Sequence, residues 1–287
     1  MKGILLAGGS GTRLYPATMA ISKQLLPVYD KPMVYYPLSL LMLAGIREVL
    51  LISTPQDISR FEMLLGNGSD WGLKIQYKVQ EKPEGIAQAF VLAKDFLDGQ
   101  PSCLVLGDNV LYGAKLEDLL VKASKIESGA YVFSYIVADP ERYGVIAFDK
   151  LGKATHIEEK PKEFVSKYAI PGIYFYDSRA SDIASKLKPS SRGELEITDL
   201  NKFYLNEGTL NVLSLGRGYA WLDMGTFDSL LEASEYIAVI ERRQSLKVAC
   251  LEEIAYRNKW ISKKEVLAKA DKLGKTNYAD YLRSLEF

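Results

Sequence analysis

The sequence is poor in the residues on which several enzyme classes depend. Its 287 residues include a single histidine, His156, which excludes any site with two histidine ligands and any Ser-His-Asp triad that does not use it. His156 alternates with apolar and charged neighbours, so we expect it on an exposed strand. The two cysteines, Cys103 and Cys250, are too few for a disulfide framework and fit a reducing cytoplasm.

An excess of charge of one sign is also missing. The 36 basic and 36 acidic residues cancel, which argues against a nucleic acid or a membrane surface as the main partner. No apolar run is long enough to span a bilayer, and the N-terminal apolar run leads directly into charged sequence rather than a signal-peptide cleavage site. The composition therefore predicts a cytoplasmic globular protein that acts on small molecules.

The most informative stretch that is present lies at the N-terminus. An apolar run over residues 2–7 is stopped by the glycine-rich segment 8–13, which predicts a buried strand followed by a tight loop. Because glycine has no Cβ, backbone N–H groups can converge there on an anion such as a phosphate. Arg13, and Lys23 further on, would place cations beside that anion.

This loop fits two common nucleotide motifs poorly. A P-loop requires Gly-Lys-Ser/Thr after a four-residue gap, which segment 8–13 lacks. A dinucleotide fingerprint requires a glycine where Leu14 stands and an acidic residue after the second strand, where Ser53 and Thr54 stand. An NAD-dependent oxidoreductase is therefore disfavoured, while a purely structural turn remains an alternative at this point.

Strands and helices alternate through the first half of the chain. We predict strands at 2–7, 48–54, 74–80, 102–108 and 130–137, with helices near 33–45, 57–66, 86–98 and 115–127. This alternation predicts an α/β fold with a Rossmann-like, mostly parallel sheet flanked by helices. Ligands of such sheets bind at the carboxyl ends of the strands, where segment 8–13, Gln80 and Asp108 are expected.

The pattern changes from about Tyr143 onward. We predict strands at 144–148, 154–158, 173–176 and 210–215, with helices at 183–187 and 198–205. This indicates an inserted smaller sheet section, about 143–225, that carries a second substrate and completes a core of residues 1–225. Residues 226–287 are helical, and Ser262 with Glu265 forms a capping box that predicts a last helix ending near Gly274.

Two aspartates and two glutamines stand out beside the predicted strands. Asp108 and Asp223 each follow an apolar run, and carboxylates combined with phosphate oxygens suit Mg²⁺, although such an aspartate often only caps a turn. The amide of Gln80 presents a donor and an acceptor together, which matches the imide edge of thymine or uracil, and Gln24 adds a second amide near the nucleotide. Gly85 would let the backbone approach that base closely.

Several short motifs follow one another in a recognisable order. They are LAGGSGTRL at 6–14, SKQLLPV at 22–28, YGV at 143–145, EEKP at 158–161, IPGIY at 170–174 and RGE at 192–194. This series resembles the sugar-1-phosphate nucleotidylyltransferases, and among them the glucose-1-phosphate thymidylyltransferases most closely, over nearly the whole chain. The chain departs from the family pattern at Pro171, where threonine is frequent, and at Glu81 and Lys82.

The resemblance implies transfer of a thymidylyl group from dTTP to glucose-1-phosphate, giving dTDP-glucose and pyrophosphate, the first step of dTDP-rhamnose synthesis. It implies Mg²⁺ as cofactor, with Asp108 and Asp223 as its ligands. The implied catalytic residues are Arg13, Lys23, Asp108, Lys160 and Asp223. A UTP-dependent uridylyltransferase remains the nearest alternative, because thymine and uracil share the edge that Gln80 would bind. A catalytically silent nucleotide-sugar sensor is a second alternative.

The resemblance also implies three sets of binding residues. The nucleotide is expected at Gly8, Gly9, Gly11, Thr12, Arg13, Lys23, Gln24, Gln80, Gly85 and Asp108. The sugar phosphate is expected at Asn109, Tyr143, Gly144, Glu159, Lys160, Ile170, Tyr174 and Arg192. An inhibitory site for dTDP-rhamnose, between subunits of a homotetramer and helped by the 226–287 segment, is expected at Tyr112, Gly113, Arg217, Glu253, Ile254 and Arg257. Glu117 stands where relatives can have histidine.

Overall fold

The computed structural model describes residues 1–9 and 11–286. Its strands are β1 (Lys2–Ala7), β2 (Pro27–Val28), β3 (Lys31–Pro32), β4 (Glu48–Ser53), β5 (Lys74–Val79), β6 (Ser102–Leu106), β7 (Asn109–Gly113), β8 (Ala130–Ile136), β9 (Gly144–Phe148), β10 (Ala154–Glu159), β11 (Tyr168–Ala169), β12 (Ile173–Tyr176), β13 (Leu210–Leu215) and β14 (Tyr219–Asp223). Its α-helices are α1 (Tyr35–Leu43), α2 (Ile58–Leu65), α3 (Gln88–Leu92), α4 (Lys94–Leu97), α5 (Leu116–Ser124), α6 (Ala180–Ala184), α7 (Ile197–Asn206), α8 (Phe227–Gln244), α9 (Leu251–Arg257), α10 (Lys263–Leu273) and α11 (Asn277–Ser284).

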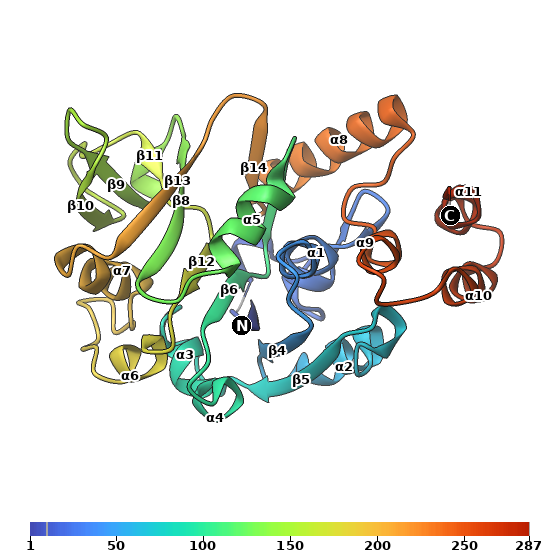
Figure 1. The fold of residues 1–287 in the computed structure, drawn as a ribbon, viewed down its shortest axis with the longest axis horizontal. Helices are drawn as coiled ribbons and strands as arrows, with labels where there is room; N and C mark the ends of the chain where they lie inside the picture. Colours follow the sequence, from blue (N-terminus) through green and yellow to red (C-terminus); the bar gives the residue numbers. More distant parts are fainter. Residues whose placement is uncertain (10, 287) are drawn as a thin grey trace.

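A mixed sheet forms the centre of the described part of the chain (Figure 1). Its ten strands run in the order β10-β9-β11-β8-β12-β6-β1-β4-β5, with β13 paired with β8. The run β6-β1-β4-β5 is parallel, and its central strands are buried apolar sequences, as expected when helices cover both faces of a sheet. The predicted α/β class, and the five strands predicted for the first half, are confirmed to within two residues at each end.

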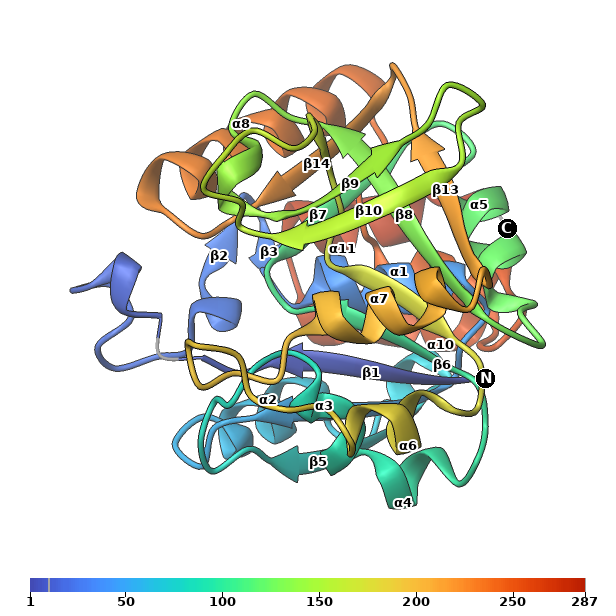
Figure 2. The ribbon, with the colours of Figure 1, turned by 90° about the vertical axis from the view of Figure 1, so that its left-hand side faces the viewer.

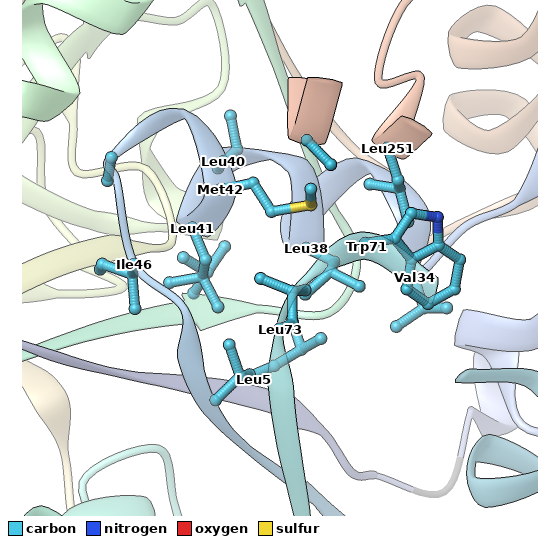
Figure 3. Packing of buried hydrophobic residues seen from close by; sticks show 14 of the residues in the cluster. Leu5, Val34, Leu38, Leu40, Leu41, Met42, Ile46, Trp71, Leu73 and Leu251 are labelled. Atoms are coloured by element: carbon cyan, nitrogen blue, oxygen red, sulfur yellow. The ribbon is translucent and has the colours of Figure 1, made fainter. Parts of the chain in front are cut away.

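Helices cover both faces of this sheet. On one face, α1, α5 and the C-terminal helices α9, α10 and α11 pack in a single apolar cluster. Figure 3 shows side chains of α1, among them Leu38 and Leu41, gathered with Leu5 of β1 and Leu251 of α9. On the other face, α3, α4, α6 and α7 pack over Ile4 and its neighbours. Each leucine buried in this way stabilises the fold by about 2 kcal/mol.

The second half of the chain extends the same sheet instead of forming a separate layer. Strand β12 pairs antiparallel with β6 of the parallel half, and β8 pairs with β12, β11 and β13. Strands β9, β10 and β11 therefore lie at one end of the molecule, and α10 and α11 lie at the opposite end (Figure 1). The section predicted at 143–225 is thus joined to the parallel half by continuous backbone pairing.

A two-stranded sheet that the sequence analysis did not predict lies beside the main sheet. Strand β7 pairs antiparallel with β14, so Asp223 lies opposite Asn109 and Tyr219 lies opposite Gly113. Both strands have only five residues, and β14 is half-buried throughout, so neither gives a strong periodic signal in the sequence. This pairing brings Asp223 next to Asp108, although 115 residues separate them in the chain.

Three predictions for the helices need correction. The single helix predicted near 86–98 is divided at Ala93 into the two short helices α3 and α4. The helix predicted at 183–187 begins earlier, at Ala180, because the Asp177 carboxylate accepts a hydrogen bond from the Arg179 N–H and fixes the chain before it. The capping box of Ser262 and Glu265 does open α10, which ends at Gly274 as predicted. It is not the last helix, however, since α11 follows it.

The single histidine and the two cysteines differ in their exposure to solvent. His156 is exposed on β10 beside Glu158, as predicted, and both cysteines are buried and free. Within the described residues, no helix is long and apolar enough to cross a membrane.

Candidate active site

The carboxyl ends of the parallel strands meet at one edge of the sheet. Ala7, Ser53 and Val79 lie in register at the ends of β1, β4 and β5, so the residues that follow them, Gly8 and Gln80 among them, lie together. Figure 2 shows the segment after β1 projecting beyond this edge of the molecule. The predicted clustering of the glycine-rich loop with Gln80 is therefore present, while Ser10 of that loop lies outside the described residues.

The two predicted metal-binding aspartates are neighbours. Asp108 immediately precedes β7 and Asp223 ends β14, and Met224 N–H donates to the Asp108 carbonyl at 3.1 Å. Lys23 Nζ donates to Asp108 Oδ2. Burial alone would raise the pKa of Asp108, but the Lys23 ammonium and the Asn109 amide hold it below its ordinary value. Asp108 is therefore an anion with a cation beside it.

Asp223 is bound by two residues on one short segment. Tyr143 Oη donates to Asp223 Oδ1 at 2.9 Å, and Arg142 Nη2 donates to Asp223 Oδ2 at 3.1 Å. Burial and the nearby Asp223 carboxylate raise the pKa of Tyr143, which keeps its hydroxyl protonated as a donor. Arg142 was not among the predicted site residues, because its contact with Asp223 joins positions 81 residues apart and forms only on folding.

Two further predicted cations reach the same place. Arg13, Lys160, Asp108 and Asp223 all line one cavity of about 270 Å³. A Cβ on Gly225 would lie 3.1 Å from Asp223 Oδ2 and 3.6 Å from Arg13 Nη1, so a glycine there leaves room for both side chains. Lys160 has φ of +45°, a left-handed conformation that is unfavourable for lysine and that turns the chain sharply after β10. All the cations and carboxylates predicted to act in catalysis thus converge here.

A second cavity, of about 260 Å³, adjoins the first. Gly8, Gly9, Gln24, Gln80 and Gly85 line it, and both cavities share Asp108 as a wall. A Cβ on Gly8 would collide with Gln80 Oε1, so a side chain at this position would displace the Gln80 amide. Neither Gly11 nor Thr12 lines a cavity, and Thr12 is exposed.

Gln24 is held by groups of the protein. Ser22 Oγ donates to Gln24 Oε1 at 2.6 Å, and Gln24 Nε2 donates to the Gly8 carbonyl at 3.2 Å. Asp57 Oδ1 in turn accepts from the Ser22 N–H at 3.1 Å. This chain of bonds ties the loop after β1 to the start of the following segment and fixes the cavity wall.

The first cavity collects the residues predicted for the sugar. Asn109, Tyr143, Gly144, Glu159, Lys160, Ile170 and Tyr174 line it. Arg192 does not line it; instead its guanidinium pairs with both Glu196 oxygens at 2.8 Å and lies 3.7 Å from Glu159 Oε1. Burial lowers the pKa of Arg192, but Glu196, Glu194 and Glu159 raise it above its usual value.

Two polar neighbours of this cavity were not predicted. Thr198 Oγ1 donates to Glu159 Oε2, and Trp221 Nε1 donates to Asn109 Oδ1 at 2.6 Å. Asn109 Oδ1 also accepts from the Gly172 N–H at 3.0 Å, so its orientation is fixed from two sides. Thr198 and Trp221 belong to elements whose ends face the cavity only after folding, so local sequence gave no signal for them.

A third cavity lies at the far end of β7. It measures about 470 Å³, and Tyr112, Gly113, Glu253, Ile254 and Arg257 line it, together with Glu117 and Lys247. Arg217, the remaining predicted member, is exposed in the turn between β13 and β14 and does not line this cavity within one chain.

Comparison with known proteins decides the family. A model of the nucleotidyl transferase family matches residues 2–239. The chain is 58% identical to the glucose-1-phosphate thymidylyltransferase of Xanthomonas campestris pv. campestris, over 99% of this chain and 96% of that protein. The chain belongs to the nucleotidyl transferase family. A second glucose-1-phosphate thymidylyltransferase, from Neisseria gonorrhoeae, is 55% identical to it over 99% of both chains. The resemblance identified from the motifs is confirmed.

Solved structures agree with this family. A crystal structure from Bacillus anthracis, described as a candidate glucose-1-phosphate thymidylyltransferase in complex with sucrose, is 41% identical. It superposes with a TM-score of 0.76 over 82% of this chain and 94% of that one. A UDP-glucose pyrophosphorylase complexed with UDP-glucose has a TM-score of 0.71 over 84% of this chain and 99% of that one, at 23% identity, a likeness that shows the fold alone.

Nucleotidyl transferases generally use a divalent metal, and the donor set of this chain fits one. The carboxylates of Asp108 and Asp223 both line the first cavity. Among the described residues, no group of three or more His, Cys, Asp or Glu side chains could hold a metal ion unaided. A hard cation with few protein ligands, completed by water and phosphate oxygens, matches that arrangement.

Proposed function

We propose that this chain transfers a thymidylyl group from dTTP to glucose-1-phosphate, giving dTDP-glucose and pyrophosphate. The observation that carries the proposal is the pair of adjoining cavities with Asp108 as their common wall and Asp223 beside it. One cavity offers amides and glycines, and the other offers a carboxylate, hydroxyls and cations. A nucleotide and a sugar phosphate placed in them would meet at the aspartates.

The reaction needs two anions to approach each other. An oxygen of the sugar 1-phosphate attacks the α-phosphorus of dTTP, a new P–O bond forms, and the bond to pyrophosphate breaks. The nucleophile is already anionic, so no general base is required, and catalysis consists of positioning and charge neutralisation. We assign Arg13 to the leaving phosphates, Lys23 to the α-phosphate and Lys160 to the incoming phosphate.

Mg²⁺ is the metal we assign to Asp108 and Asp223. When bound, it would neutralise phosphate charge in the region between the two cavities. The Lys23 ammonium contacts Asp108 and the Arg142 guanidinium contacts Asp223, so each carboxylate is held in place by a cation of the protein. Glu159, oriented by Thr198, would accept hydrogen bonds from sugar hydroxyls.

Uridylyl transfer is the nearest rival within this class, because Gln80 would pair equally well with uracil. The 5-methyl group that distinguishes thymine is apolar, and Leu6, Ile86 and Leu106 supply apolar surface in the nucleotide cavity. This surface favours thymine only modestly, since one methyl group buried in a pocket changes binding by about 1 kcal/mol.

We also propose a regulatory role for the third cavity. Its cations and aromatic side chains suit a nucleoside diphosphate sugar. The ligand we propose is dTDP-rhamnose, the end product of the pathway that dTDP-glucose would enter, which would act there as a feedback inhibitor. The helical segment 226–287 supplies Glu253, Ile254 and Arg257 to this cavity. Exposed apolar residues on and after α8, such as Leu231 and Leu246, would be covered in a cytoplasmic homotetramer.

One assay separates these possibilities. Pyrophosphate release should be measured with glucose-1-phosphate and Mg²⁺ and, in turn, dTTP, UTP, ATP and NAD. We expect release with dTTP, less with UTP and none with NAD. A rate with UTP that exceeds the rate with dTTP would favour the uridylyltransferase, and no release with any nucleotide would favour a silent sensor.

A further inference from the structure

The side chain of Gln80 is held by a neighbour that the proposed reaction does not use. Gln80 Nε2 donates to Gln88 Oε1 at 2.6 Å. Gln88 Nε2 donates to Glu84 Oε2 at 2.8 Å, and the Glu84 N–H donates to Gln88 Oε1 at 3.1 Å. Gln80, at 4% exposure, thus contacts a second amide whose own polar atoms are both engaged.

The orientation of Gln88 follows from donor and acceptor chemistry alone. A carboxylate can only accept and a backbone N–H can only donate, so Gln88 satisfies Glu84 only with Nε2 toward the carboxylate and Oε1 toward the N–H. Gln88 Oε1 therefore faces Gln80. A flipped Gln80 amide would bring two carbonyl oxygens into contact and break the Gln80–Gln88 hydrogen bond, although Gln88 Oε1 would still accept from the Glu84 N–H, at a cost of about 1–3 kcal/mol.

The segment that carries this arrangement is itself fixed. Leu195 N–H donates to the Glu84 carbonyl at 2.7 Å, and Ala87 N–H donates to the Leu195 carbonyl at 3.0 Å. Gly85 between them has φ of +104°, and a Cβ there would collide with the Leu195 backbone. The glycine is thus required by the backbone of Leu195, which gives it a structural reason besides the expected approach to the base.

A fixed amide distinguishes pyrimidines that a free amide does not. At ring positions 3 and 4, thymine and uracil present N–H and C=O, whereas cytosine presents a bare nitrogen and an amino group. An amide pairs with either base, but only by exchanging its Nε2 and Oε1 ends. A glutamine that can rotate freely binds both, and one that cannot rotate binds only one of them.

We propose that Gln88, oriented by Glu84, is a positioning residue that makes this cavity accept thymine or uracil and reject cytosine. Within the described residues, no protein donor reaches Gln80 Oε1, so this atom is available for the N3–H of the base. The inference rests on the proposed function, because it takes the nucleotide cavity as the place where the base binds.

The test is the preference for dTTP over dCTP, measured both as equilibrium binding and as pyrophosphate release. Gln88→Met keeps the length of the side chain and removes the acceptor. We expect this variant to lose about tenfold or more of the dTTP-over-dCTP preference, as one hydrogen-bond constraint is worth about 1–2 kcal/mol. Its dTTP-over-UTP ratio should stay within about twofold of the original, because thymine and uracil share the imide edge.

A double variant supplies the rescue. With Gln88→Glu and Glu84→Gln together, residue 88 carries a carboxylate that accepts from Gln80 and from the residue 84 side chain, so the dTTP preference should return. Gln76→Met, at an exposed position of β5, is the matched control and should keep the original preference.

Two results would overturn the inference. One is that Gln88→Met binds both dTTP and dCTP more weakly by the same factor, which leaves their ratio unchanged and indicates a general packing defect. The other is that this variant keeps both the affinity for dTTP and the dTTP-over-dCTP preference of the unmodified protein. Failure of the proposed function is seen separately, as absent pyrophosphate release in the unmodified protein, while the binding ratios still decide the role of Gln88.

Discussion

The first cavity and the third cavity lie at opposite ends of strand β7, yet their charges are arranged differently. At one end of β7, Asp108 directly precedes the strand and Asp223 ends the paired strand β14, and each carboxylate contacts a cation of its own, Lys23 or Arg142. At the other end, Glu253 pairs with Arg257 of its own helix and Glu117 comes from α5. Adjacent carboxylates can share a metal, whereas dispersed, internally paired charges suit binding of a ligand without catalysis.

Their common strand gives the comparison its physical basis. Val110 and Leu111 in the middle of β7 are 1% and 6% exposed, so the strand is anchored in the core between two open ends. The five residues of β7 form the most direct path along the chain from one end to the other. Substitutions near the two ends of β7 should therefore affect catalytic rate, stability and inhibition separately.

The largest effect, a loss of catalytic rate, is expected at Asp108, which we assign together with Asp223 to the metal. Asp108→Asn removes a negative charge but keeps the size of the side chain, and it leaves Lys23 without its anion. We expect pyrophosphate release from dTTP and glucose-1-phosphate to fall by about 10²–10³-fold, the range for loss of one preorganised electrostatic contact.

The thermal midpoint should also fall, by about 2–6 °C, because the variant loses the ion pair with Lys23 that holds the pKa of Asp108 low. Activity is therefore measured at a temperature at which the variant is folded. Asp95→Asn on the exposed side of α4 is the control and should keep full activity. Retention of full activity in Asp108→Asn would exclude a metal-binding role for this residue.

A stability effect is expected behind the third cavity. Lys31, 3% exposed, binds Asp30 and Glu241, and Lys247 binds the same two carboxylates. Lys31→Ala leaves Glu241 buried with one cation fewer, and we expect a loss of about 3 kcal/mol in the free energy of unfolding. Denaturant titration measures it.

The same variant distinguishes structure from chemistry. At low temperature, where it remains folded, Lys31→Ala should keep most of its catalytic rate, the reverse of Asp108→Asn. Lys264→Ala, exposed on α10, should change stability by less than about 0.5 kcal/mol. A destabilisation no greater than that of Lys264→Ala would mean that the buried ion cluster contributes nothing net.

A smaller effect is expected on regulation. Arg257 is 69% exposed and reaches the third cavity from α9, where it would bind a phosphate of dTDP-rhamnose. Arg257→Ala should weaken inhibition by dTDP-rhamnose about tenfold and leave the uninhibited rate unchanged. Steady-state rates at several dTTP concentrations measure both quantities.

In the unmodified protein the inhibition should be non-competitive with dTTP. Arg60→Ala, exposed on α2 and outside all three cavities, should behave like the unmodified protein. Inhibition that is strictly competitive with dTTP would place the inhibitor in the second cavity, where we propose that dTTP binds, instead of the third.

The local sequence was sufficient to predict those elements that a single strong pattern defines. The apolar runs of β1, β4, β5 and β6 and the glycine-rich loop after β1 indicated the parallel half and the edge at which the site forms. The residues that were missed depend on long-range pairing. The β7–β14 pairing, and with it the adjacency of Asp108 and Asp223, joins segments more than 100 residues apart.

The same limit explains Arg142, Thr198 and Gln88. Each acts through a partner side chain that folding brings near, namely Asp223, Glu159 and Gln80. No periodicity or motif encodes such a contact. Arg217, by contrast, was placed by resemblance alone, and a single chain does not bring it to the third cavity.

The smallest effect concerns the pH dependence of the ion cluster near the third cavity. Burial alone would raise the pKa of Asp30, but Lys31 and Lys247 hold it below its ordinary value. A carboxylate with a lowered pKa in the folded protein stabilises it above the unfolded pKa, near 4, and that stabilisation is lost as the pH falls through the folded pKa. Asp30→Asn should therefore be less stable than the unmodified protein at pH 7, by about 1–2 kcal/mol or about 2–6 °C in thermal midpoint.

The difference between the two proteins should shrink as the pH is lowered below about 4, because Asp30 then becomes neutral in both states. Thermal unfolding of both proteins from pH 7 to pH 3 measures this convergence, and Asp108→Asn serves as the comparison at the other end of β7. A gap that stays constant or widens on acidification would show that Asp30 stabilises the fold through packing or neutral hydrogen bonds, and that its charge makes no contribution.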